Sequence, residues 1–190
     1  MTIFYTADQH LGHRNIIASC RRPFRDVREM DEALLAGMDR VKENDLLVVV
    51  GDLMFCCKDP EAYLRRLPRC RKILVTGNHD RAWMGRTDPE AYFEKVVSVL
   101  TLEDGGRRVL VCHDPALGIT LQPEDMWLVY AHLHNNTGGP LWPKLRSMER
   151  VLNAGVDVNG WRPVTFEELL ENNRAFKAAH PGPEDKEGAP

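Results

Sequence analysis

The chain has 190 residues, of which 43% are hydrophobic and 28% charged, and its formal net charge is −3. This length and composition predict one soluble globular domain with a sizeable core. The small negative charge excludes a general electrostatic attraction to nucleic acid or to an anionic membrane.

Signals for membranes or secretion are not evident in the sequence. No apolar run approaches the roughly 18 residues that a membrane span needs, and the N-terminus lacks a basic segment followed by an apolar one. Five cysteines cannot all pair within one chain, so we expect reduced thiols and a cytoplasmic location. Cys56 and Cys57 could bind a metal ion, but they form no Cys-x-x-Cys pair, and partly buried small side chains are the simpler interpretation.

The first predicted strand, residues 3–7, is followed by Asp8 and His10. Side chains two residues apart share a face of an extended segment, so Asp8 and His10 could hold one ion together. An exposed carboxylate and an exposed histidine are the alternative. After a polar loop, apolar residues at helical spacing from Met30 to Val41 predict a helix that packs against the core.

The next two predicted strands, residues 45–50 and 71–75, each lead into a glycine and then polar residues. The first leads to Asp52, and the second to Asn78 and His79. Because polar groups are unfavourable to bury without partners, we expect these side chains at the rim of a sheet. The glycine before Asn78 is expected to let the backbone turn sharply.

An Asp-Gly-Gly sequence separates residues 96–102 from residues 107–112 and predicts a β-hairpin. The second strand of this hairpin ends in His113. Residues 127–131 predict a further strand, and the two histidines that follow, His132 and His134, are expected on one strand, each reaching a different ion.

Residues 151–158 form the last apolar run, and a helix capped by Thr165 follows. We find no internal repeat and no linker. A single domain is expected over residues 1–178, with a disordered, proline-rich and acidic tail over residues 179–190.

The polar residues at these strand ends form one candidate constellation. Six of the seven histidines lie in or beside it. Imidazole together with carboxylate and amide oxygen fits a pair of manganese, iron, zinc or nickel ions better than calcium. A carboxylate has two oxygens, so Asp52 can touch both ions. The eight candidates are Asp8, His10, Asp52, Asn78, His79, His113, His132 and His134.

This ordered set resembles the calcineurin-like metallophosphoesterase family, through Asp8-x-His10, Gly51-Asp52, Gly77-Asn78-His79-Asp80, His113 and His132-x-His134. Residues 13–16, 22–24 and 153–158 look like its small single-domain bacterial and phage branch. The resemblance implies an α/β fold, a four-layer α-β-β-α sandwich of two mixed sheets with a dinuclear metal site at the strand ends. It implies that His79 is catalytic without binding metal, and that Asp52 bridges the metals. The implied ligands are Asp8, His10 and His134 for one metal, and Asn78, His113 and His132 for the other.

The sequence departs from the family pattern at two positions. Ala131 replaces the glycine that usually precedes the paired histidines, which is a small steric change. Phe55 stands where the phosphoprotein-phosphatase branch has an aspartate that supports the catalytic histidine. His79 is therefore expected either to have another partner or to be held less strongly as imidazolium. This departure also argues against a protein phosphatase.

The expected activity is metal-dependent hydrolysis of phosphate mono- or diesters, nucleotide-like or other small esters. Two divalent ions are implied, with manganese (Mn²⁺) expected and nickel, cobalt, iron or zinc as alternatives. A hydroxide that bridges the metals would attack phosphorus, and His79 would protonate the leaving alkoxide or stabilise its charge. Two other functions stay open: a nuclease, although the net charge offers no basic groove, and a catalytically idle scaffold for protein partners, although no ligand position is missing.

Several neighbouring residues have two interpretations each. His13, Arg14, Arg22 and Arg81 are candidate phosphate contacts, but such residues are also common on surfaces. Trp83 could stack on a base, although packing is the expected role. The acidic and amide side chains near the motifs are expected to be structural, either by accepting hydrogen bonds from loop amides or by bracing the ligands. They are Asp80, Asp114, Asn153 and Asp157.

Overall fold

The structure, a computed structural model, describes residues 1–181. The tail expected over residues 179–190 lies outside this range from residue 182 onward, and residue 179 still belongs to the last helix. No helix in the described part of the chain is both long and apolar enough to cross a bilayer.

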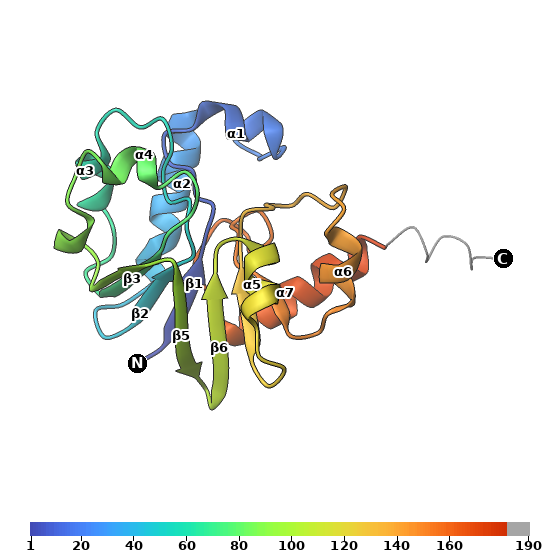
Figure 1. The fold of residues 1–190 in the computed structure, drawn as a ribbon. Helices are drawn as coiled ribbons and strands as arrows, with labels where there is room; N and C mark the ends of the chain where they lie inside the picture. Colours follow the sequence, from blue (N-terminus) through green and yellow to red (C-terminus); the bar gives the residue numbers. More distant parts are fainter. Residues whose placement is uncertain (182–190) are drawn as a thin grey trace.

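Two mixed β-sheets form the centre of the fold (Figure 1). In the first sheet, β4-β3-β2-β1-β9, the neighbouring strands from β4 to β1 are parallel and β9 is antiparallel to β1. In the second sheet, β5-β6-β7-β8, only the β5–β6 pair is antiparallel. The strands are β1 (Ile3–Thr6), β2 (Leu46–Val49), β3 (Arg71–Val75), β4 (Lys95–Val97), β5 (Val99–Asp104), β6 (Arg107–Cys112), β7 (Trp127–Tyr130), β8 (Val151–Asn153) and β9 (Val164–Thr165).

The helices cover the outer faces of the two sheets, which gives the expected four layers (Figure 1). Met30 and Leu34 of α2 belong to the core cluster on the outer face of the first sheet. Leu145 of α6 belongs to the cluster on the outer face of the second. The helices are α1 (Arg14–Ser19), α2 (Val27–Gly37), α3 (Pro60–Leu64), α4 (Arg81–Met84), α5 (Pro115–Leu121), α6 (Trp142–Ser147) and α7 (Phe166–Ala179), with 3-10 turns η1 (Met38–Arg40) and η2 (Pro89–Ala91).

The inner faces of the two sheets share one apolar cluster, which includes Val48 and Val75 from the first sheet and Val111 and Val129 from the second. Strands buried on both faces explain why their sequences are continuous apolar runs. Since β1, β2 and β3 are parallel, their carboxyl ends meet at one edge, and β6 and β7 do the same in the second sheet. The loops that carry the candidate ligands therefore meet at one rim of the sandwich.

Three expectations about the elements are wrong in detail. The strand expected over residues 96–102 is divided at Ser98, because the chain leaves the edge of the first sheet there and enters the second as β5. The last apolar run forms a strand only over Val151–Asn153, and Gly155 makes one isolated bridge to Ala7. Hydrophobic periodicity also missed β9, which is too short to show a period, and α1, which lies in the expected polar loop.

Candidate metal centre

Five of the candidate ligands lie just beyond strand ends with backbone angles that are uncommon for residues with a side chain. The φ angle is 55° at Asp8, 52° at His10, 53° at Asp52, 75° at His132 and 52° at His134. A left-handed backbone conformation costs each such residue about 1–3 kcal/mol of conformational free energy, and this strain is typical of functional sites. The expectation that the Asp8–His10 and His132–His134 pairs continue extended strands is therefore wrong.

The first candidate metal position is formed by Asp8, His10 and His134, whose ligand atoms all lie within 4.8 Å of one another. Asp8 and His10 are buried. The Asp8 carboxylate accepts a hydrogen bond from the backbone N–H of His132, at 3.0 Å. Burial raises the pKa of Asp8 to about 6. A buried carboxylate with this pKa is stabilised in its charged form by a cation.

The second candidate position is formed by Asp52, His113 and His132, whose ligand atoms also lie within 4.8 Å of one another. The side-chain oxygen of Asn78 lies 3.2 Å from His113 Nε2 and 2.9 Å from His132 Nδ1. Asp52 Oδ2 lies 3.4 Å from His113 Nε2 and 3.5 Å from His10 Nε2. The carboxylate of Asp52 is therefore between the two positions, as a bridging ligand must be.

Two of the histidines are oriented through the ring nitrogen that faces away from the centre. His113 Nδ1 donates to the carbonyl oxygen of Val50, at 2.8 Å, which leaves Nε2 for the second position. His134 Nδ1 lies 2.9 Å from the carboxylate of Asp157. Histidine ligands of metals are commonly oriented by such a carbonyl or carboxylate partner.

The protonation of these histidines follows from the same contacts. Burial by itself lowers the pKa of His134, but its hydrogen bond to Asp157 and the nearby carboxylates raise that pKa to about 10. Burial also opposes protonation of His113, but the Asp52 hydrogen bond and the charge of Asp8 raise its pKa to about 9. A metal ion that binds His113 and His134 would therefore displace a proton from each ring.

His10 provides the test of whether these residues fit a metal ion. Its Nε2 is buried and has no hydrogen-bond partner, which is rare among the polar atoms of the residues described. Burial lowers the pKa of His10 to about 2, so the ring is neutral and its lone pair is free to coordinate. The orphaned nitrogen lies beside the Asp52 carboxylate. These residues fit a pair of metal ions.

Two glycines allow the ligand loops to approach one another closely. A Cβ atom on Gly51 would lie 2.4 Å from His113 Nδ1, and one on Gly77 would lie 2.2 Å from Asp52 Oδ1. Gly51 also has a φ of 82°. The chain turns directly after Gly77, over residues 78–80, without a left-handed backbone at the glycine itself, and the close approach of Asp52 is the reason for glycine there.

Asp80 is fully buried and connects two of the ligand loops. It accepts hydrogen bonds from the backbone N–H groups of Asp52, Leu53 and Gly77, at 2.8 to 3.0 Å. The indole of Trp83 also donates to it, at 2.8 Å. The structural role expected for Asp80 and the packing role expected for Trp83 are confirmed.

A family model described as calcineurin-like phosphoesterase matches residues 1–181. The chain belongs to the calcineurin-like phosphoesterase family. The predicted family and the predicted two-sheet fold are thus confirmed.

Two relatives cover nearly the whole chain. The uncharacterized protein MJ1445 of Methanocaldococcus jannaschii is 27% identical over 182 residues, which are 92% of this chain and 94% of that protein. The second is AQ665 from Aquifex aeolicus, a protein of unknown function whose sequence is 27% identical. Its crystal structure matches with a TM-score of 0.69, over 90% of this chain and 98% of that chain. The fold of this calcineurin-like phosphoesterase is therefore shared with almost the whole of that chain, and the name of neither relative states a substrate.

In this calcineurin-like phosphoesterase the aromatic ring of Phe55 packs against the ring of His79. The ring of Phe55 lies 4.3 Å from that of His79 and 4.8 Å from that of His13, between centroids. The backbone N–H of His79 donates to Asp52 Oδ1, at 2.9 Å, and its ring lies 5.1 Å from that of His10. His79 also forms a third compact group with His10 and Asp52. The contact of Phe55 with two histidines was not expected from the sequence.

The candidate phosphate contacts lie in different places. Arg81 lines a cavity of about 380 Å³ together with Asn78 and His113. The His13 ring nitrogen Nδ1 lies 3.2 Å from that of His10, at the edge of the first metal position. Arg14 is exposed at the start of α1 and does not line this cavity. The structure thus brings Arg81 and His13 next to the metal centre.

The role expected for Arg22, on the surface or on a phosphate, is wrong. Its side chain is buried and makes two hydrogen bonds to Asp157, at 2.9 and 3.0 Å. It also donates to the backbone carbonyl oxygens of Asp8 and Gln9, at 2.6 and 2.8 Å. Arg22 and Asp157 therefore form a buried ion pair that supports His134. The only sequence signal was an arginine followed by proline and an aromatic residue, which does not indicate burial.

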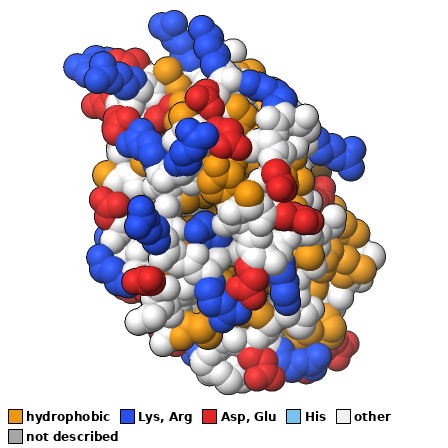
Figure 2. Space-filling view, turned by 90° about the vertical axis from the view of Figure 1, so that its left-hand side faces the viewer, with side chains coloured by type: hydrophobic (Ala, Val, Ile, Leu, Met, Phe, Trp, Pro, Cys, Tyr) orange, Lys and Arg blue, Asp and Glu red, His pale blue; other side chains and the backbone are white. Residues whose placement is uncertain are grey.

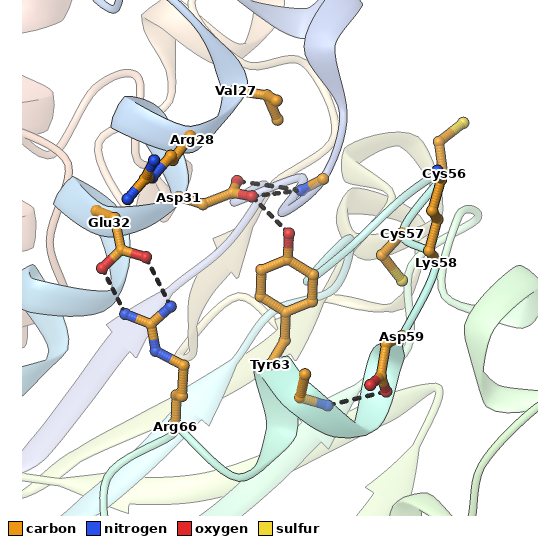
Figure 3. A pocket seen from close by; sticks show the side chains of 12 residues that line it. Val27, Arg28, Asp31, Glu32, Cys56, Cys57, Lys58, Asp59, Tyr63 and Arg66 are labelled. Atoms are coloured by element: carbon orange, nitrogen blue, oxygen red, sulfur yellow. Dashed lines mark hydrogen bonds and ion pairs between the residues drawn. The ribbon is translucent and has the colours of Figure 1, made fainter.

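A separate cavity of about 490 Å³ lies between α2 and residues 56–66 (Figure 3). Two of its acidic groups have partners in the lining: Asp31 accepts from Tyr63 Oη and from the Gly12 N–H, and Glu32 pairs with Arg66. Cys56 is exposed and Cys57 buried at its wall, and neither belongs to a candidate metal group among the described residues. We interpret the residues that line this cavity as the support of the Gly12 loop.

Proposed function

We propose that this protein is a metal-dependent phosphoesterase that hydrolyses phosphate mono- or diesters at the centre described above. The observation that carries the proposal is the pair of ligand clusters on either side of Asp52. Membership of the calcineurin-like phosphoesterase family supports the same reaction class.

The two metal ions would be held by side chains with imidazole, carboxylate and amide donors. This donor set favours manganese, with nickel, cobalt, iron and zinc as alternatives. Two bound divalent ions would supply positive charge for the phosphate and lower the pKa of the water molecule that attacks it. The proposed ligands are Asp8, His10 and His134 for the first ion, Asn78, His113 and His132 for the second, and Asp52 for both.

The remaining chemistry falls to side chains that bind no metal. His79 is part-exposed beside Asp52 and is proposed as the group that gives a proton to the leaving alkoxide. Contact with Phe55 limits the orientations of its ring. Arg81, in the cavity beside Asn78, is proposed to bind a phosphate oxygen. His13 is a second candidate contact, and Arg14, exposed at the start of α1, is a third.

Nucleic-acid cleavage is the second candidate function, and charge disfavours it. The net charge is −3. Figure 2 shows one face of the molecule, on which basic and acidic side chains are interspersed and the histidines of the metal centre are not visible. Since phosphate contacts supply most of the affinity for nucleic acid, small esters are favoured over long strands. A catalytically idle scaffold is disfavoured because the sequence has a metal-binding side chain at every ligand position of the family pattern.

The test is turnover of a chromogenic phosphodiester and of nitrophenyl phosphate by protein freed of metal and then supplied with single metals. We expect activity to vanish in chelator and to return best with manganese. Full activity in excess chelator after prolonged dialysis would refute the metal dependence. Failure to hydrolyse either ester with any of the five metals would refute the proposed reaction.

A further inference from the structure

Two cavities adjoin the metal centre, and His132 lines both. The narrow cavity, of about 380 Å³, reaches Asn78 and His113, which are ligands of the second position. The wide cavity, of about 910 Å³, reaches His134, a ligand of the first position. The narrow cavity therefore reaches only ligands of the second position, whereas the wide cavity reaches His132 and His134, one ligand of each. The shared residue His132 leaves space on two sides for the substituents of one phosphate. Both volumes are in the range of about 300–1,000 Å³ that small-molecule sites occupy.

The wide cavity has polar walls and an aromatic end. It is lined by Arg21, which is exposed after α1, and by the loop that follows the paired histidines. Asn135 in this loop donates to the carbonyl oxygen of Cys20, at 3.0 Å, so the two polar walls are tied together. At the end of α7 the rings of Phe176 and His180 lie 4.3 Å apart, between centroids. Hydrogen-bonding groups beside aromatic rings suit a sugar that carries a base.

The narrow cavity is smaller and combines a cation with an apolar rim. Arg81 and Ser98 line it on the side of the first sheet, and Asp114 and Leu117 line it on the side of α5. The side chain of Leu117 is exposed, at 47%. Leu121, on the same helix, is equally exposed, at 46%, but does not line the cavity. The rim can therefore cover an apolar ring surface while Arg81 remains with the phosphate.

We propose that the substrate is a phosphodiester of dinucleotide size, with a nucleoside in the wide cavity and the second esterified group in the narrow one. This proposal rests on the proposed phosphoesterase function and adds the substrate class. In the reaction, the bond from phosphorus to one ester oxygen breaks and a bond to the oxygen of water forms. One proton of that water ends on the departing alcohol, and the other product is a phosphate monoester. No further reactant is needed.

The experiment compares kcat/KM of the manganese-loaded protein on a dinucleoside monophosphate and on a nucleoside monophosphate. We expect the diester to be favoured by roughly tenfold or more, because the monoester fills only one cavity. Leu117→Ser should lower kcat/KM on the diester by about three- to tenfold, whereas the matched control Leu121→Ser should not change it. Arg21→Asn should lower kcat/KM on the diester by a similar factor, and Arg108→Asn is the distant control. Asparagine is chosen at position 21 because it tolerates the positive φ of 54° there.

A binding measurement separates the substrate class from catalysis. Calorimetric titration with a phosphonate-linked dinucleoside, which is not hydrolysed, should give a Kd that rises by about three- to tenfold in Leu117→Ser and in Arg21→Asn. Longer single strands share the chemistry of the dinucleotide. A kcat/KM that rises with strand length would therefore overturn the proposal that the substrate has the size of a dinucleotide. Preference for the monoester, or equal effects of Leu117→Ser and Leu121→Ser, would overturn the two-cavity assignment and leave the phosphoesterase function intact. Absence of turnover on every ester would instead refute the phosphoesterase function itself.

Discussion

The two metal positions of the centre are supported by different kinds of contact. At the first position Asp8 and His10 are buried, and His134 is held by Asp157, which in turn is paired with Arg22 in the interior. At the second position Asn78 is exposed, and His113 is held by a neutral backbone carbonyl. The first position is thus supported by a buried ion pair, and the second by a backbone carbonyl.

This difference indicates how the two ions should behave. A buried ion pair such as that of Arg22 and Asp157 cannot lose one partner without leaving an uncompensated charge, which destabilises a protein by about 3–5 kcal/mol. The support of the first position is therefore costly to remove. The second has an exposed amide and a histidine, His132, that is only partly buried, so its ion can exchange more readily and can meet the substrate. The comparison predicts a tightly held first ion and a more labile second ion.

The variant with the largest expected effect is Asp52→Asn, because it removes the charge that both positions share. We expect both ions to bind more weakly and activity to fall by about 10³-fold or more. Metal content after dialysis, measured by elemental analysis, provides the check. A variant that loses one ion and binds the other normally would show that Asp52 is not shared.

His79→Asn tests whether His79 donates a proton without belonging to either metal position. As a proton donor, His79 matters most when the leaving group is a strongly basic alkoxide. We expect a loss of about 10²–10⁴-fold on alkyl or nucleoside esters and a clearly smaller loss on nitrophenyl esters. Metal content should stay at the level of the unaltered protein. Loss of an ion would show that His79 is itself a ligand, and equal losses on both ester types would show that it positions phosphate.

Asp157→Asn should separate the two positions. It removes the charge that orients His134 and leaves Arg22 unpaired, so affinity for the first ion should fall by about 10- to 100-fold while the second ion is retained. Calorimetric titration with manganese measures the two affinities. Asp26→Asn is the matched control, since Asp26 caps α2 and holds no histidine. Equal weakening of both ions would contradict the comparison.

The smallest expected effect, counted per pH unit, is a pH dependence of metal affinity. Because the pKa of His134 is about 10 and that of His113 about 9, both are protonated in the metal-free protein near neutral pH. Each must lose its proton to bind an ion, so affinity should rise with pH, by up to about tenfold per pH unit for each position. The rise should end near pH 9 for the second ion and continue further for the first. Affinities that do not change between about pH 7 and 9 would contradict these protonation states.

The local parts of the centre could be predicted from the sequence. Apolar runs such as Val48 to Val50 predicted buried strands, because burial on both faces excludes polar residues over a short stretch. The polar residues after these strands predicted the candidate ligands, since carboxylates and imidazoles are poorly placed at a strand end without a partner. The order of these residues also indicated the family.

Only the tertiary structure decided the contacts between distant segments. Arg22 and Asp157 are 135 residues apart and meet because α1 and the loop after β8 lie at the same rim of the sandwich. The division of residues 95–104 between two sheets and the contact of Phe55 with His79 have the same origin. Hydrophobic periodicity reports which side of a segment is buried, whereas its partner is decided by how the two sheets pack together. The left-handed backbone at Asp8 and His134 likewise exists only because the surrounding packing outweighs its local strain.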